Sequence, residues 1–384
     1  MPLGSKENGN VVTRTLTIAA GRHDRRDCPV WFDPPEGAGE SFVLAAAEDG
    51  REYGAQRAGP GAFLLLDELT SDRTLRLRPT GRSAPEGRLS LAERDGGLEI
   101  AVDGRPFATY RFGDAEPRPY VYPLFGPTGR SMTRGFPMLP DDPSESHDHP
   151  HHRGLMVAFG EVNGVDCWSE TPGHGRIEHV AWERRSAGPS GVDLLERLRW
   201  VGPDGRELLH ETRRLTLYAG STVRLIDVEI ELAPASFAVL LGDTKEGGPL
   251  AIRVPTPIEG RRDGRIVNAQ GGVGEAETWG KRSAWVDYAG PIEGEEVGVA
   301  LFDHPSSFRH PTYWHVRDYG LFCPNPFGRA AFTGDAGQRG DHVLAPSERV
   351  VFRYRVCLHA GPDPVGQARA RYADYAYPPT ASWS

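Results

Sequence analysis

The clearest pattern along the chain is a strict alternation of apolar and polar side chains. Residues 226–232 read IDVEIEL and residues 352–358 read FRYRVCL, so that every second side chain is apolar. Period-2 alternation is typical of a half-buried antiparallel strand with one face toward water. Val223 and Leu225 lie on the opposite phase from Ile226, which predicts a bulge or a strand start at that point.

Turn dipeptides separate the apolar stretches. Asp103-Gly104 joins residues 98–102 to residues 107–112, and this dipeptide favours the two-residue turn of a β-hairpin. Further Asp-Gly pairs stand at 49–50, 95–96, 204–205 and 263–264. One segment has the features of a helix, namely Pro364–Tyr375, which follows a Gly-Pro pair near the C-terminus.

The composition favours the same fold class. The 384 residues include 47 Gly and 33 Pro, which helix interiors tolerate poorly. A hydrophobic share of 38% is enough for a packed core. We therefore expect an all-β protein, with a small N-terminal β-unit in residues 1–95 and a large antiparallel β-sandwich in residues 96–384. Strand-like stretches at 13–18, 41–46 and 88–92 belong to the predicted small unit.

Charge, hydropathy and cysteine usage exclude several protein classes. A net charge of −9 does not provide the basic surface that nucleic acid requires. Apolar runs such as Phe237–Leu241 are far shorter than the roughly 20 residues of a membrane helix, and the first residues lack the apolar core of a signal peptide. The four cysteines lie far apart and form no CxxC pair, which favours reduced thiols. We expect a cytoplasmic protein without nucleic-acid or membrane partners.

The densest group of chemically active side chains is the loop Ser146–Gly154, which reads SHDHPHHRG and holds four of the 13 histidines. Proline after His149 predicts an extended backbone there. Alternation would then direct His147, His149 and His151 to one side and His152 to the other. Such imidazoles suit acid–base chemistry near neutral pH. They also suit a divalent metal, with His147, His149 and His151 as candidate ligands.

Two further segments carry candidate residues. Lys245 and Glu246 follow an apolar run, and at a strand end they would form a base with an electrostatic partner. Trp314 stands beside His315 and Arg317, and aromatic faces next to hydrogen-bonding groups suit a sugar ring. An ordinary polar turn and an aromatic core strand are the alternative interpretations of these two segments.

One further candidate residue lies in an irregular segment. The Pro- and Gly-rich segment 120–140 contributes Arg134, which reaches the same site if the loops converge at one end of a sandwich.

The chain contains no GxGxxG, no Walker A, no GxSxG and no HExxH motif. Nucleotide-binding and serine-hydrolase functions therefore have no support.

The motifs YVYPLFGPTG, DHPHHRGLMVAFGEVNGVDCW, DTKEGGPLAIRV and PTYWHVRDYGLFCPNPFG together resemble a bacterial family of uncharacterised function that is labelled PmoA, or methane oxygenase. The resemblance covers residues 98–375 and leaves residues 1–95 outside. It implies a fold similar to the galactose-mutarotase-like supersandwich and a setting among sugar-catabolic genes. The oxygenase meaning of the label conflicts with the chain, because it lacks the membrane-spanning segments of such a subunit.

We therefore expect a carbohydrate-active enzyme that acts on a glycoside or keto-sugar by acid–base chemistry, through glycoside cleavage, elimination or epimerisation. The candidates for acid–base or orienting roles are His149, His151, His152, Glu246, Lys245 and His315. The candidate substrate contacts are Arg134, Arg153, Trp314, Arg317 and Asn325. No cofactor other than a divalent metal is indicated, and the expected partner is a small carbohydrate.

Two alternatives stay open. A non-catalytic carbohydrate-binding or scaffold protein would present exposed Trp faces and no buried titratable group. A metal-dependent oxygenase on a β-barrel would hold its metal through His and Glu side chains on strands.

Overall fold

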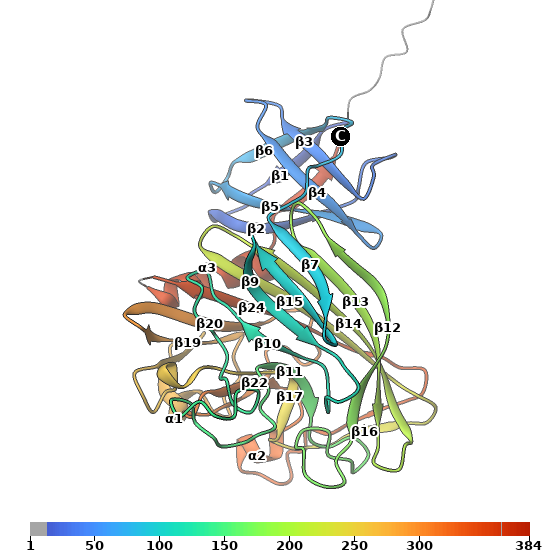
Figure 1. The fold of residues 1–384 in the computed structure, drawn as a ribbon, viewed down its shortest axis with the longest axis vertical. Coiled ribbons are helices and arrows are strands. Elements are labelled where there is room, and N and C mark those ends of the chain that lie inside the picture. The colour runs from blue at the N-terminus through green and yellow to red at the C-terminus, as the bar shows by residue number, and fades with distance from the viewer. Residues whose placement is uncertain (1–13, 362) are drawn as a thin grey trace, which may run out of the picture. The chain divides into compact units, whose positions relative to one another are not determined.

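The computed structural model describes residues 14–361 and 363–384, and these form two compact units. The smaller unit contains the described residues up to Glu86 together with Pro379–Ser384, and the larger unit spans Gly87–Pro378. Almost all regular structure is antiparallel β-strand (Figure 1). The all-β prediction is therefore confirmed.

The small unit is one seven-stranded antiparallel sheet in the order β2-β5-β4-β3-β6-β1-β25. Its outer strands β2 and β25 come together, because the Phe32 and Trp383 rings lie 6.3 Å apart and Trp383 Nε1 donates to the carbonyl of Asp33 at 2.7 Å. The strands are β1 (Leu16–Ala19), β2 (Arg25–Phe32), β3 (Ser41–Ala46), β4 (Glu52–Ala58), β5 (Gly61–Leu69), β6 (Thr74–Pro79) and β25 (Thr380–Trp383).

Two eight-stranded antiparallel sheets build the large unit, with a two-stranded ribbon β16-β23. The first sheet, in spatial order, is β21 (Tyr313–Val316), β22 (Leu321–Asn325), β17 (Gly247–Arg253), β11 (Leu155–Phe159), β10 (Tyr120–Leu124), β9 (Arg105–Arg111), β8 (Gly97–Val102) and β7 (Leu89–Arg94). The second is β12 (Arg176–Ala187), β13 (Val192–Val201), β14 (Glu207–Ala219), β15 (Val223–Pro234), β24 (Val350–Ala360), β20 (Glu295–Asp303), β19 (Trp285–Ile292) and β18 (Arg265–Asn268).

The remaining elements are short. The ribbon strands are β16 (Val239–Leu241) and β23 (His342–Leu344). The helices are α1 (Gly274–Thr278), α2 (Arg329–Thr333), α3 (Pro364–Ala376) and the 3-10 turn Thr256–Ile258. Helix α3 confirms the predicted C-terminal helix, and its first turn is capped by Asp363, whose side chain accepts from Gly366 N.

A continuous apolar core contains inward side chains of both large sheets. Val157 and Ile252 represent the first sheet in this core, and Ile226 and Val356 represent the second. The hairpin predicted at Asp103-Gly104 joins β8 to β9. Its turn residues have φ values of 50° and 74°, as a type I′ turn requires.

The boundary between the units differs from the predicted one near residue 95. Strand β7 pairs with β8 across the Asp95-Gly96 turn and so extends the first large sheet, rather than belonging to the small unit. The C-terminal strand β25 instead pairs with β1 in the small unit. Sequence alternation cannot reveal either pairing, because it predicts strands but not their neighbours.

No bulge occurs at the phase change in β15. The strand starts at Val223 and pairs with β24 without a register shift, so that Leu225 lies opposite Cys357. Both residues are buried, and α3 packs against β24, β19 and β20 on this side. The sheet is thus covered on both faces at this end, and period-2 burial is lost there.

Within residues 14–361 and 363–384, no helix has the length and apolar character needed to cross a membrane.

Deleting residues 379–384 should selectively loosen the small unit, because β1 then keeps only β6 as a partner. We expect faster amide hydrogen exchange in β1 and unchanged exchange in β15 of the large unit. Hydrogen-exchange mass spectrometry of the truncated and full chains measures this difference. Equal protection of β1 in the two chains would contradict the strand assignment.

Candidate active site

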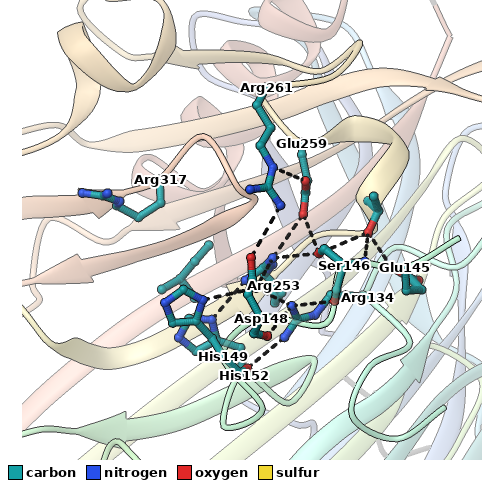
Figure 2. Close-up of polar contacts among 12 residues, drawn as sticks. Arg134, Glu145, Ser146, Asp148, His149, His152, Arg253, Glu259, Arg261 and Arg317 are labelled. Carbon is teal, nitrogen blue, oxygen red and sulfur yellow. Dashed lines mark hydrogen bonds and ion pairs between the residues drawn. The ribbon is translucent and has the colours of Figure 1, made fainter. Parts of the chain in front are cut away.

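The histidine-rich loop is fixed by the fully buried guanidinium of Arg134 (Figure 2). Arg134 Nη1 donates to the carbonyls of Ser146 and Asp148 at 3.0 and 2.8 Å, and Nη2 donates to the carbonyl of His149 at 2.9 Å. Nη1 also lies 2.7 Å from Asp148 Oδ1. Because these bonds occupy the guanidinium, Arg134 positions the loop and is not the substrate contact that we predicted.

A second buried guanidinium, Arg253, continues the network (Figure 2). Its Nη2 lies 2.8 Å from Asp148 Oδ1 and 3.1 Å from Glu259 Oε1. Arg261 Nε binds the other oxygen of Glu259 at 2.7 Å. Burial alone would raise the pKa of Asp148, but Arg253, His149 and Arg134 outweigh burial and lower this pKa to about 2. Asp148 is therefore a carboxylate at neutral pH.

The loop brings three imidazoles together instead of alternating them. The His149 ring lies 4.8 Å from His152 and 4.8 Å from Tyr319, with interplanar angles of 2° and 17°. The His151 ring is 4.4 Å from His152. The predicted extended backbone at His149 is wrong, because its φ is 46°. A non-glycine residue in this region is strained, and the bonds from Arg134 hold it there.

His147 lies away from this cluster. Its ring stacks on Phe136 at 4.6 Å, and its Nε2 is 3.0 Å from the carbonyl of Asp142. The predicted ligand trio of His147, His149 and His151 is therefore not brought together. Among the described residues, no group of three or more His, Cys, Asp or Glu side chains is arranged to hold a metal ion.

The inner histidines are held neutral by burial. His152 is 1% exposed, and its Nδ1 lies 3.2 Å from Arg253 Nη1. Since a guanidinium only donates, Nδ1 accepts this bond and the ring proton is on Nε2. Burial, followed by the charges of His151 and Arg253, places the pKa of His152 well below its usual value. Burial and Arg118 lower the pKa of His151 to about 4.

His315 and Glu246 approach the same place from other segments. His315 on β21 is 3% exposed, and its Nδ1 has no hydrogen-bond partner among the described residues. Burial lowers the pKa of His315 to about 4, although the charge of Glu246 opposes this shift. For Glu246, burial raises the pKa, but its ion pair with Lys245 outweighs burial and lowers this pKa overall. Glu246 is therefore a carboxylate beside neutral imidazoles.

These groups stand on the outer face of the first large sheet, opposite the core. Trp314 points inward into the core, and the next residue, His315, points outward. Around this outer face lies a separate buried cluster that includes Tyr120, Tyr122, Met156, Ala158, Trp168, Ala251, Leu321 and Cys323, with Tyr319 packed against it. Trp168 lies directly over Gly247, where a Cβ would come within 2.5 Å of the indole. Only glycine fits beneath Trp168.

Two predicted substrate contacts, Trp314 and Asn325, are buried within the protein. Trp314 is fully buried and donates from Nε1 to the carbonyl of Ser283 at 2.8 Å. Asn325 is also fully buried, and its amide donates to the carbonyls of Thr244 and Gly247, which fixes the turn that carries Lys245 and Glu246. The structure therefore leaves neither side chain open to a ligand, because Trp314 lies in the core and Asn325 is held by the backbone of the turn.

Arg153 also has a partner within the protein. It makes two bonds of 2.8 Å to the carboxylate of Glu170, and burial, which lowers its pKa, is outweighed by this carboxylate. Arg317 is the predicted contact that stays accessible. Its side chain is 35% exposed, it contacts Glu275 at 3.3 Å, and it lies outside the network drawn in Figure 2.

Five residues around the site were not predicted from the sequence, namely Arg253, Glu259, Arg261, Trp168 and Tyr319. Tyr319 lies in the same segment as the predicted residues Trp314, His315 and Arg317. The guanidinium carbon of Arg253 lies 4.8 Å from the centre of its ring. No motif in the neighbouring sequence marks the other four residues as part of a site. Arg253, for example, ends an apolar strand, and an arginine at that position is common at protein surfaces.

The comparison with family models matches residues 97–373 to a family of unknown function, DUF6807. The chain belongs to the DUF6807 family. The match covers the two large sheets except for strand β7 and leaves the small unit outside, in agreement with the extent of the resemblance found in the sequence. Among curated proteins, none matches the chain significantly.

Solved structures with a related fold include three enzymes or assigned enzymes. A galactose 1-epimerase from Lactobacillus acidophilus NCFM is 11% identical, with 71% of this chain and 98% of that chain covered and a TM-score of 0.32. A protein from Escherichia coli K12 assigned as an aldose 1-epimerase is 12% identical, with 71% and 98% covered and a TM-score of 0.26. A β-arabinopyranosidase is 12% identical, with 72% and 39% covered and a TM-score of 0.29. At these TM-scores we infer nothing about activity from the three proteins.

Replacing Arg134 should destabilise the large unit strongly. In R134M the carbonyls of Ser146, Asp148 and His149 lose their donor inside the protein, so we expect a loss of about 3–5 kcal/mol in the free energy of unfolding. R317M removes a half-exposed guanidinium with one ion pair, so we expect a loss of at most about 1 kcal/mol. Denaturant unfolding measures both variants. Equal losses would contradict the positioning role of Arg134.

Acid should destabilise the large unit through its buried histidines. The folded pKa of His315 is lowered to about 4, whereas the unfolded value is near 6.5. The unfolded chain therefore binds more protons between these values, and stability falls as pH falls from about 6.5 to about 4. The contribution of His315 is roughly 2–3 kcal/mol. Unfolding measured across this range should show a shallower slope in H315Q, and an unchanged slope would refute the assignment.

Proposed function

We propose that the large unit carries an active site that performs acid–base chemistry on a glycoside or keto-sugar. The observation that supports this most directly is the convergence of His149, His151, His315 and Glu246. These residues come from three separate segments, and neighbouring rings connect them. Trp168 lies 5.9 Å from the His151 ring and directly over Gly247, the residue after Glu246, while Tyr319 stacks on His149. His315 lies opposite Cys323, which belongs to the same buried cluster as Trp168. Imidazoles and a carboxylate at one place suit acid–base chemistry.

In this proposal Glu246 is the base. It is 47% exposed and carries a negative charge at neutral pH, so it can reach a bound substrate. A keto group acidifies the adjacent C–H bond, and Glu246 removes that proton while the electron pair moves onto the carbonyl oxygen. Lys245 and Arg317 stabilise the resulting oxyanion. Expulsion of the leaving group at the next carbon gives elimination, and return of the proton to the other face gives epimerisation.

His149 is the proposed acid. Its Nδ1 lies 3.2 Å from Asp148 Oδ1, and the ionised Asp148 orients the ring. The side chain of His149 is 40% exposed, which leaves its other nitrogen accessible to a leaving group. His315 offers its unpartnered Nδ1 to a hydroxyl of the sugar. A carboxylate that fixes an imidazole in this way is a recurrent device in acid–base catalysis.

The alternatives have less support. A carbohydrate-binding module would present exposed Trp faces. Among the described residues, the only tryptophan with a largely exposed side chain is Trp31, which lies in the small unit. Such a module would also have no use for buried titratable groups such as His152 and His315. An oxygenase would need a metal-ligand set, which the separation of His147 from His149 and His151 does not provide. The PmoA label stays a prediction.

The test uses a panel of keto-glycosides with the full chain in D₂O, monitored by NMR. We expect turnover, with deuterium entering the carbon next to the keto group. E246Q and H149N should each lower the rate about 10²–10⁴-fold, with wild-type stability. The control E293Q changes a carboxylate that is 69% exposed and pairs with Arg130, away from these histidines, and should keep wild-type activity.

Binding of a sugar without turnover or deuterium exchange on any panel member would contradict the proposal and favour a binding module. Equal activity of E246Q and wild type would refute the role of Glu246.

A further inference from the structure

A cavity of about 250 Å³ lies in the large unit away from the candidate active site, between the loop after β9 and the edge of the second sheet. Its lining includes Phe112 and Glu116 from the loop and Arg176, Glu178 and His179 from β12. At about 30 Å³ per water, its volume corresponds to roughly eight waters. None of these residues belongs to the candidate active site described above.

His179 is held in this cavity by a buried carboxylate. Its Nδ1 lies 2.6 Å from Glu196 Oε1, and Glu196 is 1% exposed. The other oxygen of Glu196 accepts from the hydroxyl of Tyr110, which also accepts from Arg213 Nη1 at 3.1 Å. Because Glu196 accepts, the Nδ1 of His179 carries a proton, and its Nε2 is directed away from the carboxylate. His179 is 18% exposed, so the ring remains accessible.

His179 is backed by a network of buried charged groups, which costs more desolvation free energy than a purely structural histidine requires. Arg213 is itself bound in two-point contact by Glu211, at 2.6 and 3.0 Å, and Trp200 Nε1 donates to the same carboxylate at 2.7 Å. Burying ionised groups costs several kcal/mol each unless they are paired. Glu196 has His179 and Tyr110 as its hydrogen-bond partners. These bonds fix the imidazole of His179 in the lining of the cavity.

The two arginines that line the cavity, Arg176 and Arg199, already have partners. Arg176 Nη2 donates to the carbonyls of Asp114 and Glu116 at 2.8 and 2.7 Å. Arg199 binds Glu178 at 2.9 Å and Glu207 at 3.0 Å. No guanidinium is thus left without a partner to attract an anion at the described lining. The aromatic face of Phe112, whose ring lies 4.9 Å from that of His179, provides an apolar wall.

We propose that this cavity binds a small neutral hydroxylated molecule, a monosaccharide or a cyclic polyol. Phe112 covers a C–H face of the ligand, and His179 Nε2 bonds one of its hydroxyl groups. The bond needs no net charge on the ligand, in agreement with the paired arginines. This site is independent of the proposed acid–base chemistry, because it uses different side chains and no turnover.

The test is a titration of the full chain with glucose and with myo-inositol, monitored by the ring Cε1–Hε1 signals of the histidines in NMR. The loss of one signal in H179Q assigns His179. We expect this signal to shift saturably for at least one probe, with a Kd of about 1 mM. F112A should weaken the binding at least tenfold. Since the readout is local, inactivity at the other site does not affect it.

His210 is the matched control, because it also pairs with a glutamate, Glu207, at 3.2 Å but is 56% exposed and lies outside the cavity. Its signal should not shift. The absence of a saturable shift of His179 with both probes overturns the proposal, and so does equal affinity in F112A. If F112A fails to fold, the wild-type titration decides alone, with the His210 signal as its reference.

Discussion

The candidate active site depends on the pairing of two fully buried guanidiniums, those of Arg134 and Arg253, with Asp148 and the backbone of the histidine-rich loop. A charge taken out of water is stable only when it is paired and hydrogen-bonded. Here the same contacts that satisfy the arginines also bend the loop at His149 and ionise Asp148. The conformation of the histidine-rich loop and the charge of Asp148 follow from this one requirement.

This arrangement explains why the outer face of the first large sheet is organised differently from its inner face. Inward side chains such as Trp314 form an apolar core, whereas outward ones such as His315 meet the loops. Asn325, at the end of β22, fixes the turn that carries Glu246. The sandwich thus serves as a rigid support. The histidine-rich loop, the turn that carries Glu246 and strand β21 place their polar groups together on it.

Local patterns were enough to predict the fold class, because alternation and Asp-Gly turns are properties of neighbouring residues. They identified β15, β24, the hairpin at residue 103 and helix α3. They could not predict which strands pair, so β7 and β25 were placed in the wrong unit. The site shows the same division. The histidines were found by their density, but the φ of 46° at His149 depends on a guanidinium 15 residues away in sequence.

The central claim is that burial keeps the imidazoles of His151 and His315 neutral around a carboxylate. Long-range ¹H–¹⁵N NMR of the histidine rings across a pH titration tests it most directly, with H151Q and H315Q for assignment. The account predicts that His151 and His315 stay neutral through pH 6 and begin to charge only toward their pKa values of about 4. Titration of both rings near 6.5, as for an exposed histidine, would contradict it.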